Sequence, residues 1–194
     1  MRKLALLTFQ TLNGVMQAPS MPEEDYSGNF REGGWAMPYW EEVMEQVRLH
    51  AMKEPYDLLL GRKTYELFAP HWTNPENDGP EAEKFRSARK YVVTDSLKGF
   101  SWENSHALSP KTLAEEISGL KQGHGPLLQV HGSWQLIQAL LHHDLVDEIR
   151  LWTFPVLVGP GKRLFENPSQ PSRFSLMKSE QTSGGALMTL YRKA

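Results

Sequence analysis

The chain has 194 residues, 40% of them hydrophobic and 23% charged, which is typical of a globular protein with one full core. The net charge of −2 gives no basic field for nucleic acid, and the lack of cysteine excludes disulfides, thiolate metal sites and a cysteine nucleophile. No stretch approaches the roughly 20 apolar residues of a membrane span. We therefore expect a single cytoplasmic domain over residues 1–194 without a membrane or nucleic-acid partner.

The N-terminal part predicts a strand, a long loop and a helix. Apolar residues predict the strand over 3–9, and Asn13-Gly14 is a strong turn signal. Residues 18–37 are polar and rich in glycine and proline, which indicates a mobile loop over a site, with a disordered connection as the alternative. Apolar residues at helical spacing then predict a helix over 38–53.

A short buried strand over 56–60 leads into four residues that could bind phosphate. Gly61 permits a close backbone approach, Arg62 and Lys63 supply two cations, and Thr64 lies where a helix begins. Because a helix N-terminus presents free N–H groups and partial positive charge, this stretch predicts a phosphate site for a nucleotide cofactor. The alternative is an ordinary strand–helix turn with solvated basic residues.

The middle of the chain continues the alternation of helix and strand. The expected elements are a short helix that Pro70 ends, a helix over 81–88, a strand over 90–96, an edge strand near Trp102, and a helix from Ser109-Pro110 to Gly123. Thr94, Asp95 and Ser96 end the strand, where hydroxyls could hold a ribose or its phosphate. The alternative is a turn in which Asp95 bonds its own backbone.

A second strand–glycine–helix unit follows. A strand over 126–132 ends at Gly132, and Ser133, Trp134 and Gln135 begin a helix whose N–H groups form a second phosphate candidate. His131 lies at this proposed site, although a packed strand-end histidine is the alternative.

The C-terminal part predicts three strands. They cover 147–158, with Pro155 marking an edge, bend or bulge, then 173–182 and 186–192, which a hairpin turn at 183–185 joins. Alternating strands and helices predict an α/β fold with a mostly parallel sheet covered on both faces. The turns after Leu60, Val93 and Val130 would then open at one edge of the sheet, where ligands bind.

Other chemistry is less well supported. His142 and His143 are adjacent on a helix and point apart, so we expect no metal site. Trp35, Trp40 and Trp72 could wall a pocket for a flat ring, with core packing as the alternative.

Three stretches resemble a known superfamily. Leu-Leu-Leu-Gly-Arg-Lys-Thr-Tyr-Glu66, Val-His-Gly-Ser133 and the segment 146–165 resemble dihydrofolate reductase-like proteins. The chain is most similar to the C-terminal reductase domain of bifunctional riboflavin-biosynthesis deaminase-reductases and to stand-alone bacterial proteins built on it. The resemblance implies three α-β-α layers, an eight-stranded, mainly parallel sheet with an antiparallel C-terminal strand, NADPH as hydride donor, and a homodimer.

The resemblance also implies roles for particular residues. Residues 61–64 would meet the cofactor phosphates, 94–96 would lie near the adenosine ribose, and 132–135 would hold the pyrophosphate. The residues implied near the nicotinamide are Asn13, Gly14 and Val15.

The chain departs from the riboflavin reductases on the substrate side. Thr11-Leu12-Asn13-Gly14 replaces their usual Ser-Leu-Asp-Gly, and Val130-His131-Gly132 replaces an acid and two glycines. Dihydrofolate reductases use a carboxylate on their first long helix, where this chain has Glu41 and Glu42, and Asp25 in the loop is a further possibility. The catalytic candidates are Asn13, Glu41 and Glu42, with the proton passing through water held by Asn13 or a loop carboxylate.

The expected function is NADPH-dependent reduction of a small pteridine- or aminouracil-like heterocycle, in which the cofactor supplies the hydride. The alternative is a nucleotide- or flavin-binding module of the same fold without turnover.

Overall fold

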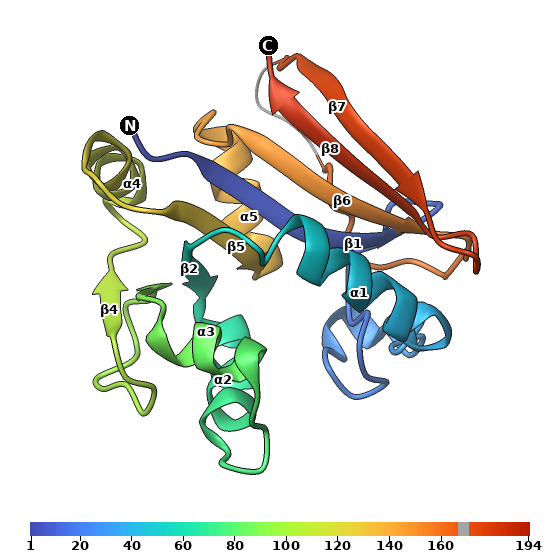
Figure 1. Ribbon diagram of the computed structural model, residues 1–194, viewed down its shortest axis with the longest axis horizontal. Helices are drawn as coiled ribbons and strands as arrows, with labels where there is room; N and C mark the ends of the chain where they lie inside the picture. The colour runs from blue at the N-terminus through green and yellow to red at the C-terminus, as the bar shows by residue number, and fades with distance from the viewer. Residues whose placement is uncertain (167–170) are drawn as a thin grey trace. The chain divides into compact units, whose positions relative to one another are not determined.

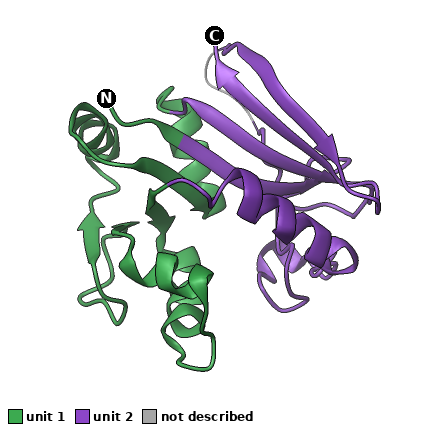
Figure 2. Ribbon diagram, in the orientation of Figure 1, with its two compact units in different colours: residues 1–4, 55–145 green, residues 5–54, 146–194 purple. Residues whose placement is uncertain are grey.

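The computed structural model describes residues 1–166 and 171–194. The chain divides into two compact units, which Figure 2 shows in different colours. Unit 1 contains residues 1–4 and 55–145, and unit 2 contains residues 5–54 and 146–194. No helix within the described ranges is both long enough and apolar enough to cross a membrane.

Unit 1 has four parallel strands in the order β4-β3-β2-β5 (Figure 1). These strands are β2 (Tyr56–Gly61), β3 (Lys90–Val93), β4 (Ser105–Leu108) and β5 (Leu127–Gly132). Its helices are α2 (Arg62–Thr73), α3 (Pro80–Ser87), α4 (Leu113–Gln122) and α5 (Trp134–His142). Every residue of β2 is buried, as its apolar run requires of a central parallel strand.

Unit 2 contains the remaining strands. These are β1 (Leu4–Thr11, whose first residue belongs to unit 1), β6 (Glu148–Phe154), β7 (Phe174–Gln181) and β8 (Leu187–Lys193). β1 pairs with β6 in parallel, whereas β8 pairs antiparallel with both β6 and β7. The helical segments are η1 (Ser27–Asn29), η2 (Met37–Tyr39) and α1 (Trp40–His50).

The expected fold class is therefore confirmed. Residues 1–166 and 171–194 contain eight mainly parallel strands with helices on both sides, and the C-terminal strands form an antiparallel hairpin. The predicted hairpin turn is also present, since the Thr182 N–H donates to the Ala186 carbonyl at 2.9 Å. Gly185 in this turn has φ +86°, a conformation that favours glycine.

The prediction that Pro70 ends a helix was wrong, because α2 continues to Thr73 with Pro70 inside it. Proline lacks an N–H and costs the helix one hydrogen bond. The last turn is instead held by tertiary and side-chain contacts. The Trp72 ring stacks on Phe85 with centroids 4.1 Å apart, and the Thr73 hydroxyl donates to the Ala69 carbonyl at 2.7 Å.

The edge strand lies a few residues later than the sequence predicts. It is β4, which begins at Ser105, whereas Trp102 is 2% exposed and packs under the Lys90 ammonium, 4.4 Å from its ring. The backbone N–H of Trp102 donates to the Tyr65 hydroxyl at 3.0 Å rather than to a neighbouring strand. A bulky aromatic here fills the core instead of extending the sheet.

Several other boundaries also differ from prediction, and three of them have a clear cause. α4 begins at Leu113 and not at Ser109, because the Glu116 carboxylate accepts hydrogen bonds from the Ser109 N–H and the Thr112 hydroxyl and folds the preceding residues into a turn. β6 stops at Phe154, immediately before a proline that cannot donate to the ladder. β3 stops at Val93, before the polar residues that form a turn.

Candidate functional site

A pocket of about 230 Å³ lies in unit 1 where the ends of β2, β3 and β5 meet the starts of the following segments. As the sequence predicts, the turns after Leu60, Val93 and Val130 contribute to one site. The lining residues are Gly61, Arg62, Lys63, Val93, Thr94, Asp95, Ser96, Pro110, Leu113, Ser133, Gln135, Leu136 and Ala139.

Two helix N-termini open on this pocket. Gly61 is the N-cap of the 12-residue helix α2, and Ser133 is the N-cap of the 9-residue helix α5. Gly61 has no side chain, and the Ser133 side chain makes no capping hydrogen bond to the first amides of α5. Because each N-terminus carries partial positive charge and N–H donors, the pocket favours an anionic group such as phosphate.

Glycine is required at the ends of β2 and β5. A Cβ at Gly61 would lie 2.1 Å from the Ser133 Oγ atom. Gly132 has φ +146°, and a Cβ there would lie 2.8 Å from the Thr64 hydroxyl oxygen. The peptide bond between Gly132 and Ser133 is cis. Each strand end thus packs its backbone against a hydroxyl residue of the other strand–glycine–helix unit, which brings the two helix starts together.

The charged lining is cationic overall. Arg62 and Lys63 supply two positive charges, and Asp95 supplies one negative charge. The Arg62 Nη1 atom donates to both carboxylate oxygens of Glu66, one helical turn further along α2, at 2.8 and 2.9 Å. These two side chains are each 43% exposed, so the pair lies in contact with solvent beside the pocket.

The residues after β3 form a turn that Thr94 holds. The Thr94 side-chain oxygen accepts hydrogen bonds from the N–H groups of Ser96 and Leu97, each at 3.2 Å. A turn was the alternative prediction, although with the Asp95 side chain in the bonding role. In the structure Asp95 and Ser96 are exposed lining residues, and Thr94 is buried.

His131 packs beside an aromatic cluster. Its Nε2 atom lies 2.9 Å from the Gln129 amide nitrogen, and its ring centroid lies 5.8 Å from that of Phe68 and 5.7 Å from that of Phe85. Burial lowers the pKa of His131 to about 4. His131 is therefore neutral at pH 7 and carries no charge for a phosphate, and neither it nor Trp134 is among the lining residues.

The depressed pKa of His131 predicts a pH-dependent stability. Between about pH 4 and 6.5 the unfolded chain binds a proton at this residue and the folded chain does not, so the free energy of unfolding rises with pH across this window. The full difference between the pKa of His131 in the unfolded and the folded chain corresponds to about 3 kcal/mol of stability. Urea titrations from pH 4 to 7 should show a shallower pH slope for His131→Gln than for the wild type. His124→Gln, at an exposed histidine, should keep the wild-type slope, and an unchanged slope in His131→Gln would contradict the prediction.

Pocket residues that sequence reasoning missed come from helix faces. Leu136 and Ala139 on α5, and Pro110 and Leu113 before and at the start of α4, give the pocket its apolar wall. The sequence signal that could have found them was helical spacing, since positions three apart on α5 share a face. That signal is common to all buried helix faces.

In unit 2, Asn13 has a structural task. Its amide nitrogen donates to the Val158 carbonyl at 2.7 Å, and its side-chain oxygen accepts from the Thr11 hydroxyl at 2.7 Å. The Thr11 side-chain oxygen in turn accepts from the Val15 N–H at 3.0 Å, around Gly14 with φ +81°. This tight turn fixes Asn13, Gly14 and Val15 against the segment that follows β6.

The two glutamates at the start of α1 differ in their contacts. The Glu42 carboxylate accepts hydrogen bonds from the Ser183 hydroxyl and from the Gly184 N–H, the latter at 3.1 Å. These hydrogen bonds lower the pKa of Glu42, so at neutral pH it is an ionised cap of the β7–β8 turn. Glu41 is exposed.

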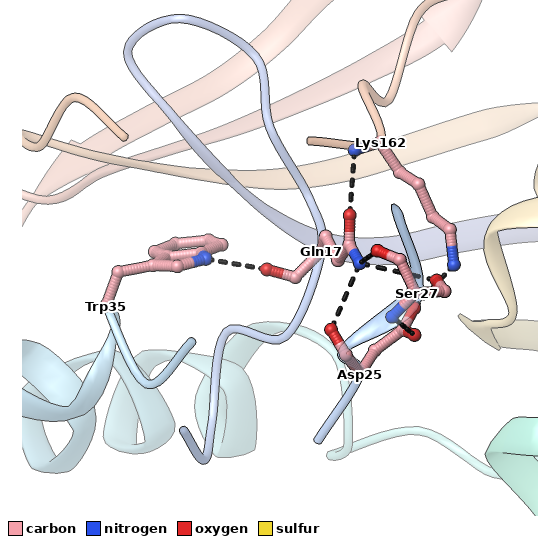
Figure 3. Close-up of polar contacts among 5 residues, drawn as sticks. All are labelled: Gln17, Asp25, Ser27, Trp35 and Lys162. Carbon is pink, nitrogen blue, oxygen red and sulfur yellow. Dashed lines mark hydrogen bonds and ion pairs between the residues drawn. The ribbon is translucent and has the colours of Figure 1, made fainter. Parts of the chain in front are cut away.

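The loop over residues 18–37 is folded rather than a disordered connection. Gln17 holds it together, as Figure 3 shows: its Nε2 atom donates to the carbonyls of Asp25 and Ser27, at 3.0 and 2.9 Å. The Lys162 N–H donates to the Gln17 side-chain oxygen at 3.1 Å, and the Trp35 indole N–H donates to the Gln17 carbonyl at 2.8 Å. One buried amide therefore ties this loop to the segment after β6.

Asp25 in the same cluster is ionised. Its carboxylate lies 2.5 Å from the Lys162 ammonium and accepts a hydrogen bond from the Ser27 N–H at 3.0 Å. Burial acts to raise the pKa of Asp25, but the hydrogen bonds from Lys162 and Ser27 outweigh it and lower the pKa to about 2. Asp25 therefore carries no proton to donate at neutral pH.

The tryptophans pack against aromatic residues of their own units. Trp35 is 8% exposed, and its ring centroid lies 5.3 Å from that of Phe154. Trp40 lies 5.7 Å from Phe9 in unit 2, and Trp72 stacks on a ring in unit 1. These contacts agree with the core-packing alternative.

A model of the RibD C-terminal domain matches residues 2–188, nearly the whole chain. The chain belongs to the RibD C-terminal domain family. The expected relationship to riboflavin-biosynthesis reductases is therefore confirmed.

The chain is also similar to individual proteins. The uncharacterized protein YyaP of Bacillus subtilis strain 168 is 29% identical over 139 residues, which are 69% of this chain and 72% of YyaP. The dihydrofolate reductase of Enterococcus faecalis, solved with NADP(H) and RAB-propyl, has a TM-score of 0.63 at 14% identity, over 98% of this chain and 96% of that one.

A Thermotoga maritima diaminohydroxyphosphoribosylaminopyrimidine deaminase/5-amino-6-(5-phosphoribosylamino)uracil reductase has a TM-score of 0.62 at 15% identity. The match covers this whole chain and 57% of that protein. At these identities the solved structures establish a shared fold.

Proposed function

We propose that the protein is an NADPH-dependent reductase of a small heterocyclic substrate, pteridine- or aminouracil-like. The observation that carries the proposal is the pocket at Gly61 and Ser133, where two uncapped helix N-termini meet beside Arg62 and Lys63. The Enterococcus protein of the same fold was solved with NADP(H), and the Thermotoga protein is named as an aminouracil reductase, which supports the cofactor and the substrate class.

The pocket residues fit the phosphate-bearing part of a dinucleotide. The first amides of α2 and α5 would hold the pyrophosphate, with Lys63 balancing its charge, and Arg62 would meet a phosphate on the adenosine ribose. Gly61 lets Ser133 pack closely against its backbone, which keeps the starts of α2 and α5 together. The exposed Ser96 hydroxyl would serve the ribose.

When bound, the nicotinamide would supply a hydride to a C=N or C=O carbon of the substrate. Among the predicted catalytic residues, Glu42 is ionised and Asn13 holds a turn, and Asp25 is also ionised. We therefore propose that the proton reaches the product from water. The protein's own side chains would then orient the substrate and cofactor and exclude bulk water, and would not donate the proton.

The same side-chain assignments favour a second candidate, a nucleotide- or flavin-binding module without turnover. We also propose, from the family resemblance, a bacterial cytoplasmic homodimer, and analytical ultracentrifugation would test the dimer.

Titration of NADPH, followed by its fluorescence and by the thermal midpoint, tests the proposed cofactor. A thermal midpoint unchanged at millimolar NADPH would contradict the reductase proposal. If NADPH binds, loss of nicotinamide absorbance with a panel of pteridines and aminouracils distinguishes a reductase from a binding module.

Arg62→Ala should weaken NADPH binding about 10-fold or more and NADH binding less, if Arg62 meets the 2′-phosphate, since a hydrogen bond to a charged group contributes about 1.5–3 kcal/mol. Isothermal titration calorimetry with both cofactors measures the difference. Arg86→Ala is the matched control, because Arg86 is a similarly exposed arginine paired with Asp78. Equal losses of NADPH and NADH affinity would place Arg62 at the pyrophosphate.

A further inference from the structure

The contact between Arg62 and Glu66 uses only part of the guanidinium. Both hydrogen bonds to the Glu66 carboxylate come from the Nη1 atom. Within residues 1–166 and 171–194, no acceptor bonds the Nη2 or Nε atoms of Arg62. These two atoms form one edge of the planar guanidinium, with parallel N–H groups at the spacing of two phosphate oxygens.

We propose that Glu66 is a positioning residue that makes the pocket selective for nucleotides with a phosphate on the adenosine ribose. It holds Arg62 through Nη1, so that the Nη2–Nε edge receives the phosphate. This inference rests on the proposed function, because it concerns the same pocket and the same dinucleotide.

The physical reason is pre-organisation. A long, half-exposed arginine loses rotamer freedom when it binds a ligand, and a partner that already restrains it removes part of that cost. Glu66 lies one turn along α2 from Arg62 and is absent from the pocket lining, so its carboxylate restrains Arg62 from outside the pocket. Loss of this restraint should affect the ligand phosphate that Arg62 binds and spare a ligand that lacks it.

A pure charge effect would look different. Removing the Glu66 carboxylate leaves the site more positive, which would strengthen the binding of every phosphorylated ligand. The ratio of affinities for NADPH and NADH therefore separates positioning from charge. Glu66→Gln separates them again, because it removes the charge and keeps one side-chain acceptor for Nη1.

The experiment is isothermal titration calorimetry of the full chain at physiological ionic strength with NADPH, NADH, adenosine 2′,5′-bisphosphate and ADP. We expect Glu66→Ala to weaken NADPH and adenosine 2′,5′-bisphosphate by about 3- to 10-fold and to leave NADH and ADP unchanged. Glu66→Gln should recover most of the wild-type affinity. Glu115→Ala, at an exposed glutamate in the first turn of α4, is the matched control and should bind all four ligands like the wild type.

The outcomes separate the two proposals. If wild-type protein binds none of the four ligands, the proposed function fails and this inference fails with it. If the wild type binds NADPH but Glu66→Ala keeps the NADPH-to-NADH ratio or raises it, the positioning role is overturned and the proposed function stands. Circular dichroism of each variant checks that α2 remains folded.

Discussion

Gly61→Ala is expected to abolish measurable binding of NADPH and to lower the free energy of unfolding by about 1–3 kcal/mol. The added Cβ would lie 2.1 Å from the Ser133 Oγ atom and 3.0 Å from the Ser133 backbone nitrogen. The hydroxyl can rotate away, but the backbone nitrogen cannot, so the starts of α2 and α5 must separate. Calorimetric titration with NADPH and urea denaturation measure the two effects.

The chain offers a matched control for this substitution. Gly119 lies inside α4, and a Cβ added there would meet no atom within 4 Å, so Gly119→Ala should be neutral or raise stability by about 0.5–1 kcal/mol. Adding Ser133→Gly to Gly61→Ala removes the side-chain part of the clash and should recover part of the lost stability. Wild-type affinity in Gly61→Ala would show that the two helix starts do not hold the ligand together.

Asp57→Ala is expected to lower the free energy of unfolding by about 3–5 kcal/mol, because it leaves a buried guanidinium without its carboxylate. Asp57 and Arg2 have side chains that are 9% and 4% exposed, and their charged atoms lie 2.5 Å apart. Asp57 also accepts a hydrogen bond from the Arg89 N–H at 3.3 Å. Urea denaturation of wild type and variant measures the loss.

An exposed pair of the same two residue types provides the control. Asp78 and Arg86 lie 2.8 Å apart, but the Asp78 side chain is 80% exposed, so Asp78→Ala should lower the free energy of unfolding much less than Asp57→Ala does. The contrast between these variants isolates burial, because the chemistry of the pair is the same. Equal losses in the two variants would contradict the argument.

Local signals in the sequence identified the candidate phosphate site because its chemistry is contiguous. The apolar run over 58–60 predicts a buried strand, Gly61 a close approach, and the residues after it a helix N-terminus, and all three properties depend on neighbouring residues. The same reasoning identified Ser133 as the start of α5. It failed at Pro70, where stacking between Trp72 and Phe85 overrides a local helix-breaking signal.

No comparable local signal in the sequence predicts which hydrogen bonds and ion pairs the polar side chains of unit 2 form. Glu42, expected to be catalytic from its place on α1, caps a hairpin far along the chain through Ser183 and Gly184. The pKa of Asp25 is lowered against the effect of burial because Lys162 and Ser27 donate hydrogen bonds to its carboxylate. Lys162 and the partners of Glu42 are distant in sequence, and no periodic pattern relates them.

Hydrophobic periodicity and turn chemistry were enough to determine the alternation of strands and helices and the three strand ends that carry glycine and polar residues. Both act over a few neighbouring residues, so they can be read without knowledge of the fold. Only the tertiary structure decided three contacts of the site. Gly61 packs against Ser133, Gly132 packs against Thr64, and the His131 ring packs beside an aromatic cluster. Close packing between distant segments sets those contacts, and packing depends on the shapes of side chains that local patterns do not relate.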